Sequence, residues 1–178
     1  KEENTIIFFC SDNGPDDGLF RKGVASAGKL RGHKHQMYEG GIHVPSLMVW
    51  KGKLKEGSVC PERVGTVDYL PTILDLLDLP AINDRPIDGV SMVPVLAGKP
   101  ASKRTYPLAA GFMRLYDDLE TYSLIEGDYK ICIPVKRGKL EMYNLKKDPY
   151  ETTDISTKEP EIFNDLKEKL EAVKKSWL

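Results

Sequence analysis

An apolar run near the start of the chain ends abruptly in three residues that could hold a metal ion. Residues 5–10, TIIFFC, are followed by Ser11 and then by Asp12-Asn13-Gly14. A carboxylate beside an amide carbonyl offers the hard oxygen ligands that Ca²⁺ and Mg²⁺ prefer, and glycine lets the chain turn away without a Cβ in its path. Two ligands do not complete a calcium site, and these three residue types are also the commonest in turns. The residues alone leave a metal half-site and a plain turn both open.

A second polar segment precedes the next apolar run. Lys34 lies in the glycine-rich stretch LRGHKHQMYEGG, residues 30–41. An ammonium group on a flexible stem is a good point charge for a bound oxyanion. The Glu39-Gly40-Gly41 sequence predicts a sharp backbone turn just before the following strand. This segment is therefore a candidate for binding an anionic group.

Other polar side chains near these two segments are not assigned to the site. His33 and His35 flank Lys34 and are interpreted as ordinary loop residues. Asp16 and Asp17 precede a glycine, and an acidic loop tip of this kind is typical of a solvated turn. We do not count them as metal ligands.

The surrounding pattern predicts the elements that position these residues. Residues 5–10 and 44–50 are apolar, which predicts two core strands, the first buried on both faces as in a parallel sheet between helices. Residues 11–43 predict a long loop region at the strand end, where α/β folds bind ligands. Apolar residues spaced by three and four predict a helix over residues 67–79.

The pattern changes after a proline-rich connection at residues 80–101. Turn signals such as Gly127-Asp128 separate short strand-like segments, which predict a small antiparallel sheet. These segments are residues 106–110, 122–126, 129–135 and 140–145. A last helix begins about Pro160 and is expected to bury Ile162, Phe163, Leu166, Leu170 and Val173. We therefore predict two domains, residues 1–100 and 101–178.

Composition excludes several classes of partner. The chain has 26 basic and 27 acidic residues without a run of like charge, so neither nucleic acid nor a membrane surface is indicated. The spacing of Cys10, Cys60 and Cys132 indicates no zinc site, and buried free thiols are expected. An apolar strand this early in the chain suggests a fragment, whose exposed sheet edge would be open to association.

Five segments, in order, resemble the type I sulfatases, the arylsulfatase branch of the alkaline phosphatase superfamily. They are SDNGP at 11–15, GHKHQMYEGGIHVP at 32–45, VDYLPTILDLLDLP at 67–80, DGVSMVPVLAG at 88–98 and GDYKICIPVKRGKLEMYNLKKDPYETTDI at 127–155. The last segment is typical of bacterial members. The resemblance covers only the C-terminal part of a sulfatase. It implies an α/β fold: the C-terminal portion of an alkaline-phosphatase-like mixed sheet with flanking helices, plus a small antiparallel sheet covered by a C-terminal helix.

The resemblance implies that the full-length parent hydrolyses sulfate esters of sugars or aryl compounds. Asp12 and Asn13 match the family's late pair of metal ligands, for Ca²⁺ or Mg²⁺. Lys34 matches the lysine that contacts the sulfate group, which gives it a catalytic and substrate-binding role. His43 stands where the family commonly has arginine, which puts the support of that loop in question.

The formylglycine nucleophile of the family arises from a Cys/Ser-x-Pro/Ala-x-Arg motif that this chain lacks. The resemblance therefore places formylglycine in a missing N-terminal part, and the fragment itself is expected to be inactive. The implied partner is a sulfated small molecule or glycan, and the implied location is periplasmic or extracellular. Two alternatives stay open: a non-enzymatic module that binds glycan or a protein partner, and a phosphate or phosphonate ester hydrolase of the same superfamily.

Overall fold

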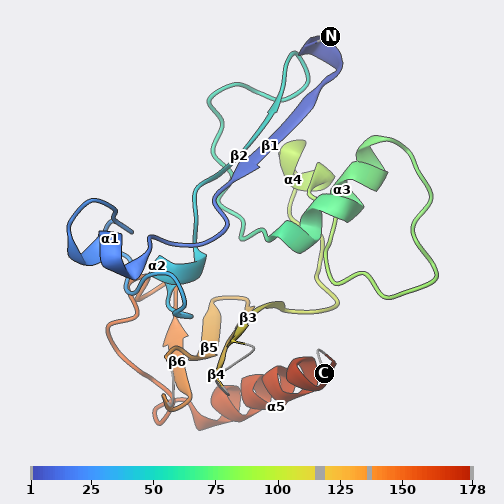
Figure 1. Ribbon diagram of the computed structural model, residues 1–178. Helices are drawn as coiled ribbons and strands as arrows, with labels where there is room; N and C mark the ends of the chain where they lie inside the picture. Colours follow the sequence, from blue (N-terminus) through green and yellow to red (C-terminus); the bar gives the residue numbers. More distant parts are fainter. Residues whose placement is uncertain (1, 115–118, 136–137, 177–178) are drawn as a thin grey trace. The chain divides into compact units, whose positions relative to one another are not determined.

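The computed structural model describes residues 2–114, 119–135 and 138–176, which form two compact units (Figure 1). One unit comprises residues 2–8 and 48–108, and the other comprises residues 9–47 and 109–176. All the residues singled out for metal and sulfate binding belong to the second unit. The division into domains at residue 100 stays a prediction.

The two apolar runs form strands, as predicted. β1 (Ile6–Cys10) and β2 (Ser46–Trp50) make a two-stranded sheet, and both strands cross the division between the units. Ile7 is 53% exposed and Phe9 is 60% exposed. The expected burial of β1 on both faces is therefore not met in the described residues, because β2 is its only neighbour in the described sheets.

The first unit contains the predicted helix near residue 70. The short helices η1 (Glu2–Asn4), η2 (Thr66–Asp68) and α4 (Val93–Leu96) accompany the longer α3 (Tyr69–Leu76). The buried Asp68 carboxylate accepts the Val90 N–H at 2.9 Å and pairs with Arg104 at 2.8 and 2.5 Å. Asp68 thus links the start of α3 to Val90 in the proline-rich connection and to Arg104 just after it.

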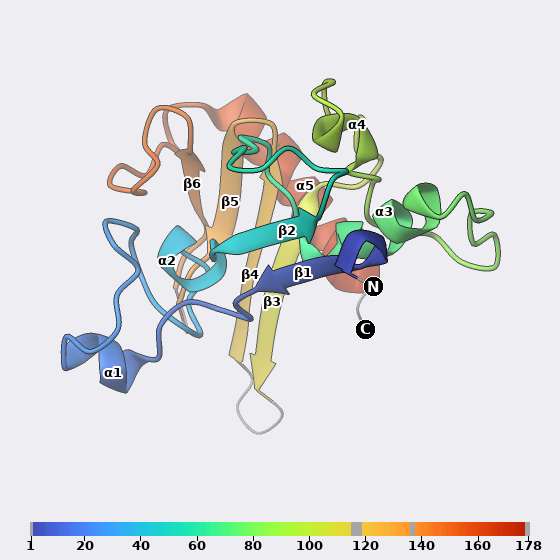
Figure 2. The same ribbon diagram turned by 90° about the horizontal axis from the view of Figure 1, so that it is seen from above.

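The second unit contains the predicted antiparallel sheet, with strand order β3-β4-β5-β6 (Figure 2). The strands are β3 (Leu108–Arg114), β4 (Leu119–Glu126), β5 (Tyr129–Ile133) and β6 (Glu141–Asn144). Gly127 adopts a φ of 57° in the predicted turn, which glycine does without strain, and Glu126 then pairs with Tyr129. The two-residue loop thus sets the register of β4 and β5.

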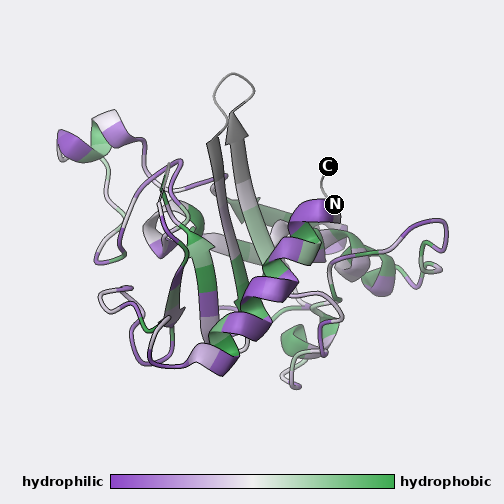
Figure 3. Ribbon diagram, turned by 90° about the horizontal axis from the view of Figure 1, so that it is seen from below, coloured by the Kyte–Doolittle hydropathy of each residue, from purple (hydrophilic) through white to green (hydrophobic). Residues whose placement is uncertain are grey.

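The last helix covers one face of this sheet. α5 (Pro160–Ser176) begins at the predicted proline, and it is hydrophilic along one side and hydrophobic along the other (Figure 3). Its buried Leu166 and Leu170 pack against Leu124, Ile131 and Met142 of the sheet. Full burial of such a side chain contributes about 1.5–3 kcal/mol, so this contact stabilises the unit. It forms one of the two apolar clusters among the described residues of the unit.

The opposite face of the same sheet supports the polar segment around residue 37. Side chains alternate along a strand, so Cys132 faces away from its neighbour Ile131. Cys132 packs in a second cluster with Tyr143, Met37 and Tyr38. The Met37 N–H donates to the carbonyl of Pro134 at 3.0 Å. Residues 31–42 therefore pack against this face of the C-terminal sheet.

The cysteines are free, but only one is fully buried. Cys132 is buried, and burial raises the pKa of its thiol to about 12. Cys10 is half-buried, whereas Cys60 is exposed, so the expectation of buried thiols is wrong for Cys60. Among the described helices, none has the length and apolar composition needed to cross a bilayer.

Candidate functional site

The predicted loop over residues 11–43 contains two short helices, α1 (Asp17–Arg21) and α2 (Glu39–Ile42). The Asp16 carboxylate caps α1 by accepting the Gly18 N–H at 2.9 Å. The Asp17 carboxylate pairs with Arg21 at 2.7 Å. Both acids therefore have structural partners within α1.

The turn after β1 lies directly against the Gly40-Gly41 backbone of α2. The Gly14 N–H donates to the carbonyl of Gly41 at 2.8 Å. A Cβ atom on Gly14 would lie only 1.9 Å from the carbonyl oxygen of Gly40. Glycine is needed at position 14 because two backbones meet there, and this contact fixes where Asp12 and Asn13 lie.

Gly40 and Gly41 also lie against the loop that carries Lys34. A Cβ on Gly40 would lie 2.4 Å from the Gly32 carbonyl oxygen, and one on Gly41 would lie 2.1 Å from that of Gln36. The Lys34 N–H itself donates to the carbonyl of Pro15 at 2.9 Å. The structure therefore brings together the two segments that the sequence predicted for chemistry, with the Gly-Gly backbone between them.

The three side chains predicted to act on a ligand differ in their exposure. Asp12 is exposed, whereas Asn13 and Lys34 are half-buried. Within the described part of the chain, none of the three side chains makes a hydrogen bond or ion pair. The described part of the chain contains no group of three or more His, Cys, Asp or Glu side chains that could hold a metal ion. Two oxygen donors and one ammonium group are thus available to a ligand.

The two histidines beside Lys34 differ in their environments. His33 Nδ1 lies 2.9 Å from the carbonyl oxygen of Lys34, and its Nε2 lies 3.2 Å from the Asp17 carboxylate. These contacts order the loop and link it to α1. His35 is exposed and has a φ of 73°, which is uncommon for a residue other than glycine.

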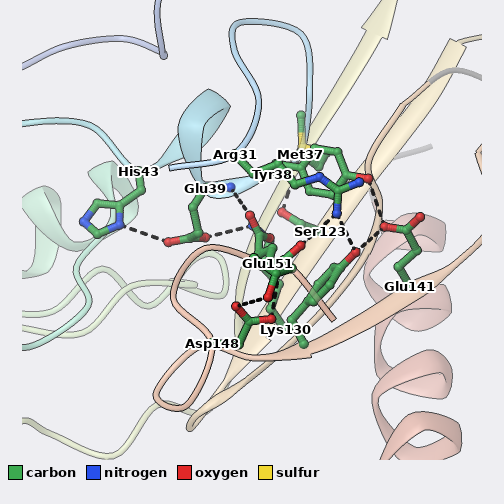
Figure 4. A network of polar contacts seen from close by, with 12 residues as sticks. Arg31, Met37, Tyr38, Glu39, His43, Ser123, Lys130, Glu141, Asp148 and Glu151 are labelled. Atoms are coloured by element: carbon green, nitrogen blue, oxygen red, sulfur yellow. Dashed lines mark hydrogen bonds and ion pairs between the residues drawn. The ribbon is translucent and has the colours of Figure 1, made fainter. Parts of the chain in front are cut away.

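A buried cluster of charges, which we call the ion triad, consists of Glu39, Lys130 and Glu151 (Figure 4). The Lys130 Nζ atom lies 2.8 Å from Glu39 Oε1 and 2.8 Å from Glu151 Oε1. Glu151 Oε2 accepts the backbone N–H of Glu39 at 2.6 Å. His43 Nδ1 lies 3.0 Å from Glu39 Oε2, so this histidine also supports the loop where the family commonly has arginine.

One ammonium group faces two carboxyl groups in the triad, and the two respond differently. Burial alone raises the pKa of Glu39, but the hydrogen bond from His43 and the charge of Lys130 outweigh it and lower the pKa to about 2. Burial raises the pKa of Glu151, and the Lys130 ammonium offsets this only in part. Glu39 is therefore the carboxylate that stays ionised in acid.

The lowered pKa of Glu39 predicts an acid-dependent stability. A carboxyl whose pKa falls on folding stabilises the folded state above its ordinary pKa of 4.5, and this contribution is lost as the pH falls to about 2. The contribution of Glu39 to the free energy of unfolding is expected to decrease by about 3 kcal/mol over that interval. Urea denaturation at a series of acid pH values, followed by circular dichroism, measures the slope.

A pair of variants tests the source of that slope. Glu39→Gln removes the titrating group and should flatten the pH dependence. Glu171→Gln removes an exposed carboxylate of α5 that lies 3.5 Å from Lys174, and it should leave the slope unchanged. An unaltered slope in the Glu39→Gln variant would assign the effect to another group.

A second polar cluster holds Arg31, whose carbonyl accepts the Gly40 N–H at 2.6 Å. The guanidinium lies 3.9 Å from the centre of the Tyr38 ring and donates to the Tyr143 hydroxyl at 3.1 Å. Both tyrosine hydroxyls donate to Glu141, at 3.0 and 2.5 Å. Burial and this carboxylate raise the pKa of Tyr38 above its ordinary range. The cluster fixes the loop just before Lys34.

Sequence reasoning did not predict the ion triad. One signal was present, since Lys130 lies within the apolar strand YKICI, where a buried lysine requires a charged partner. No comparable signal marked Glu151, because its partner Glu39 lies 112 residues away in the chain. Only the folded structure pairs them.

Comparison with known proteins decides the family. The family described as N-sulphoglucosamine sulphohydrolase, C-terminal, matches residues 32–176. The chain belongs to the sulfatase family. An N-acetylgalactosamine-6-O-sulfatase of Bacteroides thetaiotaomicron is 28% identical, and the match covers 97% of this chain and 37% of that sulfatase.

Solved structures show the same fold. The crystal structure of Ps i-CgsB matches with a TM-score of 0.82 at 23% identity, over 96% of this chain and 36% of that one. The structure of BT4656 in complex with its substrate D-glucosamine-2-N,6-O-disulfate matches with a TM-score of 0.71 at 25% identity, over 97% of this chain and 34% of that one. The family match confirms the sulfatase resemblance and the structural matches confirm the α/β fold, and the chain spans about a third of the length of these relatives.

Proposed function

We propose that this chain is the C-terminal part of a metal-dependent sulfatase, in which Asp12 and Asn13 bind the metal ion and Lys34 binds the sulfate group. The observation that carries the proposal is the contact of both segments with Gly40-Gly41. This contact holds together the segments that carry Asp12, Asn13 and Lys34, whose side chains make no hydrogen bond or ion pair with the described residues. Membership of the sulfatase family supports the same roles.

Each residue has a distinct part in this chemistry. Asp12 supplies a charged oxygen and Asn13 a neutral one, which suits Ca²⁺ or Mg²⁺. A bound cation would neutralise negative charge on the sulfate oxygens. Lys34 adds a second positive charge at the same group, and because its loop is already ordered, little reorganisation is needed when charge develops there. These residues bind and orient the ester and stabilise its transition state.

Two relatives support a proposal for the substrate class. The N-acetylgalactosamine-6-O-sulfatase and the protein solved with D-glucosamine-2-N,6-O-disulfate point to a sulfated amino sugar. A sulfated glycan or a small sulfated sugar is therefore the proposed substrate, with an aryl sulfate as a convenient probe. An aryl phosphate of the same leaving group distinguishes a sulfatase from a phosphate ester hydrolase.

Lys34→Met tests the sulfate-binding role in the full-length protein. Loss of the ammonium should lower kcat and raise KM for an aryl sulfate, with kcat/KM reduced on the order of 100-fold. Steady-state kinetics with the aryl sulfate and with a 6-O-sulfated hexosamine measure both parameters. Lys29→Met, an exposed lysine of the same loop region, serves as the matched control and should behave as the wild type.

The outcomes separate the candidate functions. Kinetics of Lys34→Met equal to those of Lys29→Met would contradict a contact between Lys34 and sulfate. Faster turnover of the aryl phosphate than of the aryl sulfate would instead support the phosphate ester hydrolase. Metal-independent binding of a sulfated sugar without turnover would support the glycan-binding module.

A further inference from the structure

The ion triad has no part in the proposed chemistry, yet it buries three ionisable side chains. Lys130 and Glu151 are both fully buried, and Glu39 is 5% exposed. A buried ion group generally stabilises a fold no better than well-packed apolar residues would. Its distinctive property is that it fixes the backbone groups that it binds in one orientation.

The triad fixes the start of α2. Glu39 is the first residue of this helix, and its N–H has no partner within the helix. Glu151 accepts that N–H, while Lys130 holds the Glu39 side chain. Lys130 comes from β5 and Glu151 from the chain after β6, so the C-terminal sheet determines where α2 begins.

The next residues of α2, Gly40 and Gly41, contact both segments that carry the proposed ligand-binding residues. Gly41 accepts the Gly14 N–H, one residue after Asn13, and Gly40 donates to Arg31, three residues before Lys34. A Cβ on Gly40 would lie 2.5 Å from the Arg31 carbonyl oxygen, and a Cβ on Gly14 would lie 1.9 Å from the Gly40 carbonyl oxygen, so the backbones at both contacts are closely packed. A shift of Glu39 must therefore displace Asn13 and Lys34 together.

The backbone at Glu151 is an independent indication of this role. Glu151 has a φ of 54°, a conformation that residues other than glycine seldom adopt. The Asp148 carboxylate holds the surrounding loop by accepting the N–H groups of Thr152 and Thr153 at 2.8 and 2.9 Å. The carbonyl of Glu151 also accepts Arg31 at 2.8 Å. An unfavourable conformation is thus kept where it directs a carboxylate at the Glu39 N–H.

We propose, on the basis of the function proposed above, that Lys130 and Glu151 are positioning residues for the metal and sulfate sites. They act through Glu39 and Gly40-Gly41, and they touch neither metal nor substrate. The C-terminal sheet thereby sets the separation between the metal ligands and Lys34. This assigns a role in the reaction to two residues more than 90 positions away from Lys34 in the chain.

The test uses the full-length protein and variants of matched charge. Lys130→Met leaves two buried carboxyl groups without a cation, and Glu151→Gln keeps the shape while removing one charge. Lys169→Met is the control, because Lys169 also bridges two carboxylates, Glu126 and Asp165, but lies exposed on α5. We expect kcat/KM for an aryl sulfate to fall about 100-fold in Lys130→Met, with a higher Ca²⁺ concentration at half-maximal activity, and to be unchanged in Lys169→Met.

Hydrogen exchange supplies a measurement that does not depend on activity. In the metal-free protein, peptides covering residues 9–15 and 31–42 should exchange faster in Glu151→Gln than in wild type, whereas peptides of α5 should not change. If Lys130→Met does not fold, Glu151→Gln alone carries the test. Exchange and Ca²⁺ dependence like those of wild type in a folded Glu151→Gln variant would overturn the positioning role.

The Asp12→Ala variant separates failure of this inference from failure of the proposed function. If Asp12→Ala is inactive but Lys130→Met is fully active, the proposed metal site is supported and the positioning role of Lys130 is contradicted. Full activity in both would remove the proposed function, and the positioning proposal with it. Loss of activity in Asp12→Ala and in Lys130→Met, with Lys169→Met unchanged, supports both.

Discussion

Asp12→Ala in the full-length protein should abolish turnover of sulfate esters, with a loss in kcat on the order of 1000-fold or more. The reason is that the carboxylate of the proposed ligand pair is removed, and the amide of Asn13 alone is a weak partner for a divalent cation. The exposed Asp12 side chain makes no hydrogen bond or ion pair with the described residues, so stability should change little. The loss of turnover should be caused by weaker binding of the metal ion rather than by unfolding.

Two measurements check this expectation together. Calorimetric titration with Ca²⁺ and with Mg²⁺ reports affinity, and steady-state kinetics report turnover of an aryl sulfate. Asp84→Ala is the matched control, because the Asp84 side chain is 64% exposed and pairs with the adjacent Arg85. Near-normal activity of Asp12→Ala with metal still bound would refute the assignment.

Gly14→Ala has the second largest expected effect, although it adds only one methyl group. The new Cβ would lie 1.9 Å from the Gly40 carbonyl oxygen and 2.9 Å from the Gly41 Cα, so the two backbones must separate. A misplacement of about 1 Å at a reacting centre reduces turnover about 100-fold, and we expect a loss of at least this size. Overpacking should also destabilise the unit by about 1–3 kcal/mol.

Gly18→Ala is the control for this substitution. Its Cβ would meet only the Asp16 side-chain oxygen, at 3.2 Å, and alanine suits the helical position in α1. Thermal unfolding and kcat of both variants give the comparison. A Gly14→Ala variant with the melting temperature and turnover of Gly18→Ala would show that the contact between the two turns is dispensable.

The C-terminal elements were predictable because their signals are local. Gly127-Asp128 marked the hairpin, and the apolar spacing from Ile162 to Val173 marked the buried face of α5. The burial of β1 was not predictable in the same way. An apolar strand indicates that other elements cover it, but it does not say which. Among the described residues, Ile7 and Phe9 are exposed, because burial depends on which elements pack against the strand.

The sequence by itself determined the types of residue available for chemistry and the family to which they belong. Asp12, Asn13 and Lys34 could be named from residue types and from their resemblance to sulfatase motifs. Only the tertiary structure decided that their segments meet across Gly40-Gly41 and that Lys130 of β5 and Glu151, after β6, contact the adjacent Glu39. The physical reason is that a side-chain signal is local in sequence, whereas a close backbone approach or a buried ion pair joins residues whose separation in the chain carries no periodicity.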